Sequence, residues 1–131
     1  MNQIKGGLPM DLEQNYGYLI VNVFTARGAI PLAGAAVTIY DAETEGKPII
    51  AVLYTDTNGK TERYALPAPN REFSLQSGNT KPYATYMIQV DLEGFHTVTN
   101  NGVPIFEEVT SIQPVEMIPL AEFNSDKVFP H

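Results

Sequence analysis

The chain has 131 residues, 44% hydrophobic and 18% charged, which suits one folded domain and excludes an intrinsically disordered chain. Its formal net charge of -7 would repel phosphate backbones and anionic membrane surfaces, so we expect neither nucleic acid nor a membrane as a partner. Because the sequence has no cysteine, disulfides, thiolate metal sites and cysteine nucleophiles are excluded.

The first predicted strand covers residues 17–26, GYLIVNVFTA, a run of β-branched and aromatic side chains. Side chains alternate between the two faces of a strand, so Leu19, Val21 and Val23 should share one face. After the glycine- and proline-rich turn in ARGAIPLAG, a second strand is predicted in AAVTIYD.

A third strand is predicted over residues 49–55, IIAVLYT, followed by the tight-turn tetrapeptide at residues 56–59, DTNG. A turn of this kind commonly joins two adjacent antiparallel strands. We therefore expect a hairpin that continues into residues 61–66, TERYAL.

The stretch from residue 67 to residue 82 contains three prolines and a glycine and predicts a long connection. Phe73 and Leu75 alternate within it and suggest a short edge strand. The next segment, ATYMIQVDLEG, alternates most regularly and predicts a strand with one buried face, formed by Tyr86, Ile88, Val90 and Leu92.

Two further strands are predicted in VPIFEEV and SIQPVEMIPL. They contain Pro104 and Pro114, and proline in a sheet favours edges because it cannot donate a ladder hydrogen bond. We therefore expect both strands at the periphery. No sustained helical spacing is found, and about seven strands joined by turns predict an all-β, two-sheet antiparallel sandwich.

The predicted sandwich domain spans residues 17–120, between an N-terminal extension, 1–16, and a C-terminal tail, 121–131. The N-terminal segment has no apolar stretch of seven residues or more, so a signal peptide is not expected in this chain. The sequence leaves the localisation open.

Several motifs follow one another in a recognisable order: PLAGAAVTIYDAE, TDTNGKTERYALPAP, YMIQVDLEGFHTV and VPIFEEVTSIQPVEMIPL. Together they resemble the carboxypeptidase regulatory-like, or transthyretin-like (prealbumin-like), β-sandwich domain over residues 17–120. The chain is also similar to modules attached to peptidoglycan-binding or spore-cortex hydrolase proteins of Gram-positive bacteria. The resemblance implies a non-catalytic accessory role, with a possible cell-envelope or spore association.

A hydrolase reading is the enzymatic alternative, because one transthyretin-like branch hydrolyses 5-hydroxyisourate and resembles this chain around TDTNGK. That branch has a histidine near the first strand and a C-terminal Tyr-Arg-Gly-Ser, and both are missing here. The histidines that are present, His96 and His131, match no nucleophile or metal-binding spacing. We therefore expect no catalytic residues.

Asp56, Asn58 and Gly59 match the middle of an EF-hand loop, a calcium-binding motif. In that register Tyr54 and Ala65 occupy the first and twelfth positions, where acidic ligands are required. A second oxygen-rich stretch, Asp41, Glu43 and Glu45, is typical of a solvated turn. We expect no metal and no cofactor.

Binding is the remaining class of function. Arg71 and Tyr83 lie within or next to the long connection and are the predicted contact residues, since long loops in compact domains are often functional. The expected partner is a protein or a neighbouring domain, with carbohydrate or peptidoglycan as the alternative. Exposed sheet edges could also pair with a partner strand or produce a homo-oligomer.

Overall fold

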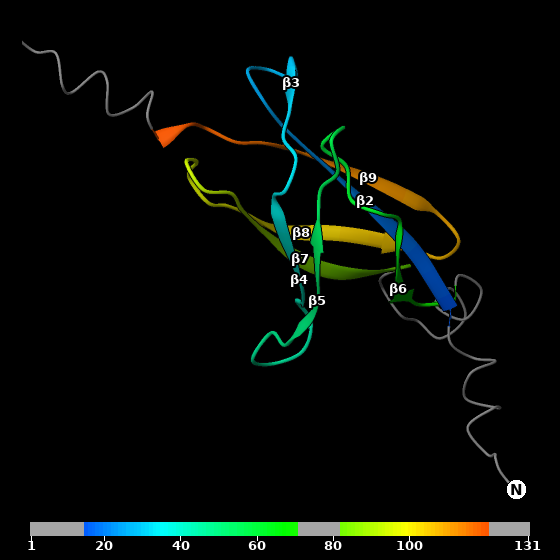
Figure 1. Cartoon of the computed structure of the whole chain (residues 1–131). Coiled ribbons are helices and arrows are strands. Elements are labelled where there is room, and N and C mark those ends of the chain that lie inside the picture. Colours follow the sequence, from blue (N-terminus) through cyan, green and yellow to red (C-terminus); the bar gives the residue numbers. More distant parts are fainter. Residues whose placement is uncertain (1–14, 71–81, 121–131) are drawn as a thin grey trace, which may run out of the picture.

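The computed structural model describes residues 15–70 and 82–120, which form a two-sheet β-sandwich (Figure 1). Its strands, in chain order, are β2 (Asn15–Thr25), β3 (Ile30–Pro31), β4 (Ala36–Asp41), β5 (Ile49–Tyr54), β6 (Tyr64–Ala68), β7 (Tyr83–Asp91), β8 (Val98–Phe106) and β9 (Thr110–Glu116). The predicted all-β sandwich is confirmed.

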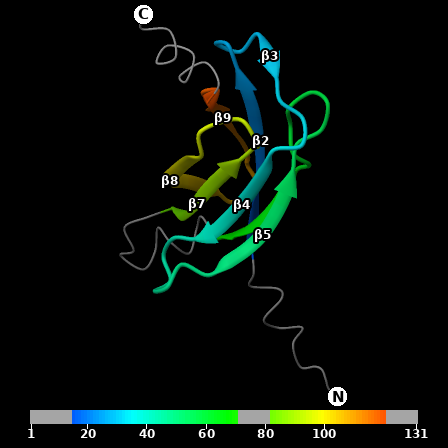
Figure 2. The same ribbon diagram turned by 60° about the vertical axis from the view of Figure 1, so that its left-hand side comes forward.

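One sheet has β2 at its centre, paired with β3, β6 and β9, and the other has the order β5-β4-β7-β8. Figure 2 shows the second sheet as one layer lying across β2. All pairs are antiparallel except β2 with β9, which is parallel. A parallel pair needs a long crossover, and here the chain between β2 and β9 runs through the other sheet.

The predicted alternation is confirmed in the core. Leu19, Val21 and Val23 on β2 are fully buried, and Ile88 on β7 is fully buried from the opposite sheet. The whole buried cluster is Leu19, Val21, Val23, Leu32, Ala35, Val37, Ile39, Leu53, Leu66, Ala68, Tyr86, Ile88, Val90, Val103, Ile105, Val115 and Met117. Burial of these apolar side chains between the layers supplies most of the stabilisation.

The expected hairpin after the tight turn is wrong. The turn forms, with the Gly59 amide donating to the Asp56 carbonyl at 2.8 Å. However, β5 pairs with β4 and β6 pairs with β2, so residues 55–63 carry the chain from one sheet to the other. The periodicity of a strand does not reveal which sheet it joins, and here buried contacts of the crossover decide it.

Two buried threonines anchor this crossover at its two ends. The Thr55 hydroxyl accepts from the Ala35 amide at 2.9 Å and donates to the Leu32 carbonyl at 2.7 Å. The Thr61 hydroxyl accepts from the Val21 amide at 2.9 Å. Both side chains satisfy backbone groups that the ladders leave unpaired, which is the usual condition for burying polar groups.

The long connection is described only at its ends. Pro67 and Ala68 belong to β6, and Tyr83 begins β7. The expected edge strand around Phe73 and Leu75 lies outside the described residues, as do the terminal segments 1–14 and 121–131.

The last two strands, β8 and β9, lie at the margins of their sheets, as their prolines predicted. β8 nevertheless contributes the fully buried Val103 and Ile105 to the core, and Met117, directly after β9, is fully buried as well. Within the described parts of the chain, no helix is long and apolar enough to cross a membrane.

Candidate functional site

The strands that flank each sheet differ in whether they can accept another strand. An edge strand exposes unpaired amide and carbonyl groups, and proline or charge on the edge discourages pairing. The flanking strands β3, β6, β8 and β9 contain Pro31, Pro67, Pro104 and Pro114, respectively. The remaining flanking strand, β5, has the sequence IIAVLY, with neither proline nor charge.

The backbone of β5 points hydrogen-bonding groups away from its sheet. The Thr55 amide donates to the Ala35 carbonyl at 3.1 Å, and the Thr55 carbonyl accepts from the Gly34 amide at 2.9 Å, both toward the β4 side. Backbone direction alternates along a strand, so the amides and carbonyls of Val52 and Tyr54 face the open side. Over residues 15–70 and 82–120, β5 pairs only with β4.

The side chains of β5 are exposed and apolar. Ile49, Val52 and Tyr54 expose 61%, 46% and 64% of their surface, whereas Leu53 is buried at 7%. Val52 lies opposite Thr38 of β4, on the outer face of the sheet. Large apolar side chains gathered on one strand are typical of an interaction surface.

The strand is regular only in its second half. The β4–β5 register shifts between Ile39 and Tyr40, which leaves Ile50 as the extra residue of a β-bulge. The regular part of the edge therefore runs from residue 51 to residue 54.

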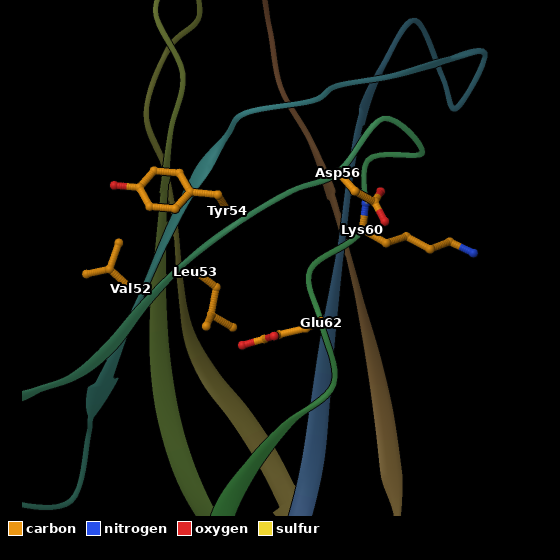
Figure 3. A pocket seen from close by; sticks show the side chains of 6 residues that line it. All are labelled: Val52, Leu53, Tyr54, Asp56, Lys60 and Glu62. Atoms are coloured by element: carbon orange, nitrogen blue, oxygen red, sulfur yellow. The ribbon is translucent and has the colours of Figure 1, made fainter.

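An open hollow of about 420 Å³ lies beside this edge, between β5 and the crossover. It is lined by Val52, Leu53, Tyr54, Asp56, Lys60 and Glu62. Figure 3 shows the Glu62 carboxyl group directed toward Leu53, while Val52 and Tyr54 point away on the other side of β5. A strand added to β5 would therefore lie over this hollow.

Charges frame the apolar edge at both ends. Lys47 precedes β5, and Asp56 follows it, next to Lys60; all three are exposed. Hydrogen bonds from the Lys60 and Asn58 amides stabilise the Asp56 carboxylate and hold its pKa below the usual value. Asp56 is therefore a fixed negative charge at the C-terminal end of the edge.

The sequence-predicted contact residues are not at this site. Arg71 lies outside the described residues. Tyr83 is half-buried at the start of β7, where its ring packs against that of Phe106 at 5.2 Å between centroids, tilted by 53°. The sequence did not single out the β5 surface as a site, because a continuous apolar run such as IIAVLY also suits a central, buried strand.

The carboxylates of Asp41 and Glu43 accept hydrogen bonds from other residues of the chain. The Asp41 carboxylate accepts from the Glu43 amide at 3.0 Å and the Thr44 hydroxyl at 2.6 Å, and a Glu43 carboxylate oxygen accepts from the Thr85 amide at 2.8 Å. No group of three or more potential metal-ligating His, Cys, Asp or Glu residues occurs in the described part of the chain. His96 is exposed, and His131 lies outside the described residues.

The pKa of Tyr86 is strongly raised, and its hydroxyl has a structural hydrogen-bonding role. Tyr86 is buried, and its hydroxyl donates to the Pro67 carbonyl, linking β7 to β6 of the other sheet. Burial, followed by the nearby charges of Asp41 and Glu43, raises the Tyr86 pKa far above its usual value. The phenol stays protonated and acts as a structural donor between the sheets.

No protein-family model and no curated protein matches this chain. Catechol 1,2-dioxygenase from Acinetobacter sp. ADP1 matches 83% of this chain and 54% of its own, with a TM-score of 0.55 and 15% identity. Catechol 1,2-dioxygenase from Pseudomonas arvilla C-1 matches 81% of this chain and 53% of its own, with a TM-score of 0.54 and 15% identity. A shaft pilin from Lactobacillus rhamnosus GG matches 78% of this chain and 49% of its own, with a TM-score of 0.51 and 19% identity.

The chain thus spans about half the length of each of these proteins. At such low identities the likeness shows a shared β-sandwich fold, and a fold by itself does not carry an activity.

Proposed function

We propose that this chain is a non-catalytic, transthyretin-like protein-interaction module that holds an extended strand of a partner at the β5 edge. The observation that carries the proposal is the contrast in edge chemistry: β5 is exposed, uncharged and free of proline, whereas the other flanking strands each contain a proline. Addition of a strand to such an edge is a common mode of peptide recognition.

The hollow beside β5 also supports a binding role rather than an enzymatic one. The hollow beside β5 is open, and its charged residues, Asp56, Lys60 and Glu62, lie among apolar side chains. Asp56 is engaged by the amides of its own turn, with distances of 2.8 and 3.0 Å to Asn58 and Lys60. A general acid or base needs a pKa near the working pH, and the lowered pKa of Asp56 moves away from it.

The test is selection from a displayed library of random peptides by the immobilised protein. We expect the selected peptides to be apolar and extended, and to lose binding when Val52 is replaced by lysine. Ile112→Lys is the matched control, because Ile112 is a β-branched residue exposed at 62% on another flanking strand, β9. Equal loss in both variants, or selection of no peptide, would contradict a docking role for β5.

A carbohydrate- or peptidoglycan-binding surface is the second candidate, favoured by the tilted pair of Tyr83 and Phe106. Phe106 is partly exposed, and aromatic rings of this kind can contact sugars. Retention of the protein on insoluble peptidoglycan should then fall in Phe106→Ala and Tyr83→Ala variants but not in Tyr54→Ala. Absence of retention, or retention unaffected by either substitution, would dismiss this candidate.

A further inference from the structure

We infer that the strand that occupies the β5 edge is β5 of a second copy of this chain. The β5-β4-β7-β8 sheets of the two copies then join into one continuous sheet across a twofold axis. The inference rests on the proposed function, because it names the partner of the same edge. Two identical edges paired antiparallel form an isologous interface, in which each surface must complement itself.

The backbone of β5 meets this requirement when the twofold axis passes beside Leu53. Val52 and Tyr54 present their amides and carbonyls to the open side, as the direction of Thr55 establishes. In the register centred on Leu53, Val52 of each copy lies opposite Tyr54 of the other, and each pair exchanges both of its hydrogen bonds. This register uses only the regular part of the strand and avoids the bulge at Ile50.

The side chains complement one another in the same register. Val52 and Tyr54 lie on the outer face, and they are 46% and 64% exposed in the single copy. Directly opposite partners in an antiparallel pair touch, and aromatic rings paired with β-branched side chains are among the stabilising combinations. The pairing therefore shields part of the exposed apolar surface of Val52 and Tyr54 from water.

The charges at the two ends of β5 favour antiparallel pairing. The end before the strand carries Glu45 and Lys47, and the end after it carries Asp56 and Lys60. In an antiparallel pair the first end of one copy meets the second end of the other, so that Lys47 approaches the Asp56 turn and Glu45 approaches Lys60. A parallel pair would instead place each charged residue beside the same residue of the other copy, and such like-charge contacts are destabilising.

Self-association also has to overcome the net charge of -7 on each copy. Residues 48–55 carry no charge, and the nearest charges, Lys47 and Asp56, have opposite signs. The strand itself therefore lets two copies of this acidic protein approach without direct like-charge contact, and the Glu62 carboxylate of each copy is the negative charge nearest the axis, in the hollow beside Leu53. The hollow of about 420 Å³ beside Leu53 would be covered by the second copy.

The first experiment is sedimentation equilibrium over micromolar to millimolar protein. The unmodified chain should form a dimer. Val52→Lys should weaken dimerisation by at least about tenfold, because it places a lysine opposite Tyr54 of the other copy and brings two like charges to diagonal positions across the axis. Ile112→Lys should leave dimerisation unchanged. A chain that is monomeric throughout would overturn the inference, as would equal dimerisation of the unmodified protein and Val52→Lys.

The second experiment tests the register with Leu53→Cys, which is informative because the natural sequence has no cysteine. Residues opposite each other in a non-hydrogen-bonded antiparallel pair approach to about 4.5 Å between Cα atoms, which permits a disulfide. Mild oxidation should crosslink Leu53→Cys at least about tenfold faster than Ile112→Cys. Equal rates would overturn the register centred on Leu53.

The two proposals fail in different ways. If the chain stays monomeric but peptides selected from the library still require Val52, the second copy is wrong and the docking edge stands. If neither dimer nor peptide depends on Val52, both proposals are wrong.

Discussion

Strands β5 and β9 each flank a sheet, and they differ in what they offer to another chain. Both expose a β-branched side chain, with Val52 at 46% and Ile112 at 62%. On β9, the Met117 amide donates to the Phe24 carbonyl and the Val109 carbonyl accepts from Tyr18, so odd-numbered residues bond toward β2. Pro114 therefore faces the open side, where its missing amide leaves no donor for a new strand.

Side-chain exposure alone does not distinguish these two edges. On the open side of β5, Val52 and Tyr54 each present a backbone amide and a backbone carbonyl. On the open side of β9, Pro114 presents a carbonyl but has no amide N–H. The availability of an edge for pairing therefore depends on backbone donors as well as on apolar surface.

The largest expected effect comes from the crossover that fixes the end of β5. Gly59 has a φ of +80°, and a Cβ at this position would meet the Val23 carbonyl oxygen. Gly59→Ala should cost about 3 kcal/mol or more, from backbone strain and the clash with backbone. Urea denaturation measures this cost.

Gly34→Ala is the matched control, because Gly34 has a similar φ of +77° with open space around its Cβ position. Its cost should be about 1 kcal/mol, from backbone strain alone. Equal costs in the two variants would show that the contact with Val23 does not constrain the crossover.

Thr55 gives the next largest effect, because its hydroxyl joins the end of β5 to Leu32 and Ala35. Thr55→Val should cost about 2 kcal/mol, since it leaves a buried carbonyl and a buried amide without their partner. Thr55→Ser retains the hydroxyl and should recover most of the loss in thermal unfolding. A serine variant no more stable than the valine variant would indicate that the methyl group, not the hydroxyl, matters.

Pro114→Val tests the comparison of edges directly by restoring an amide on the open side of β9. The fold should lose at most about 0.5 kcal/mol, while concentration-dependent association should increase because β9 then resembles β5. Light scattering across a protein dilution series measures the association. Unchanged scattering would mean that proline is not what keeps β9 from pairing.

The smallest expected effect is on pH dependence at Asp91, which shares a cross-strand row with Ala36 and Tyr54. Hydrogen bonds from Thr97, at 2.7 Å, and Gln89, at 3.0 Å, stabilise its carboxylate and hold its pKa below the usual 3.8. The unfolded chain therefore binds this proton first, and the contribution to stability is present above pH 3.8 and lost as the pH falls through the lower, folded pKa.

Asp91→Asn should accordingly reduce stability at pH 6 by at most about 0.5 kcal/mol, because the group is near the surface. The difference from the unmodified protein should shrink in denaturation curves recorded below pH 3.8. A difference that stays constant to pH 2.5 would rule out ionisation of Asp91 as its cause. The dimer should be unaffected at pH 6, because Asp91 lies two strands away from the open edge.

Most of the strands and their buried faces could be predicted from the sequence, because side-chain alternation is a local property of an extended chain. Leu19, Val21 and Val23 in β2, and Ile88 and Val90 in β7, were predictable from period-two patterning and are buried as expected. The prolines of β8 and β9 likewise predicted marginal positions without any knowledge of the partner strands.

Strand pairing and the open edge depend on contacts between segments that lie far apart in the sequence. The turn at residues 56–59 reads as a hairpin, yet Thr55 and Thr61 bind backbone groups of segments 20 and 40 residues away and send the chain to the other sheet. For the same reason the exposure of IIAVLY could not be read from its composition, since a continuous apolar run also suits a central strand. Its position beside β4 alone, within the described residues, turns that run into an exposed edge.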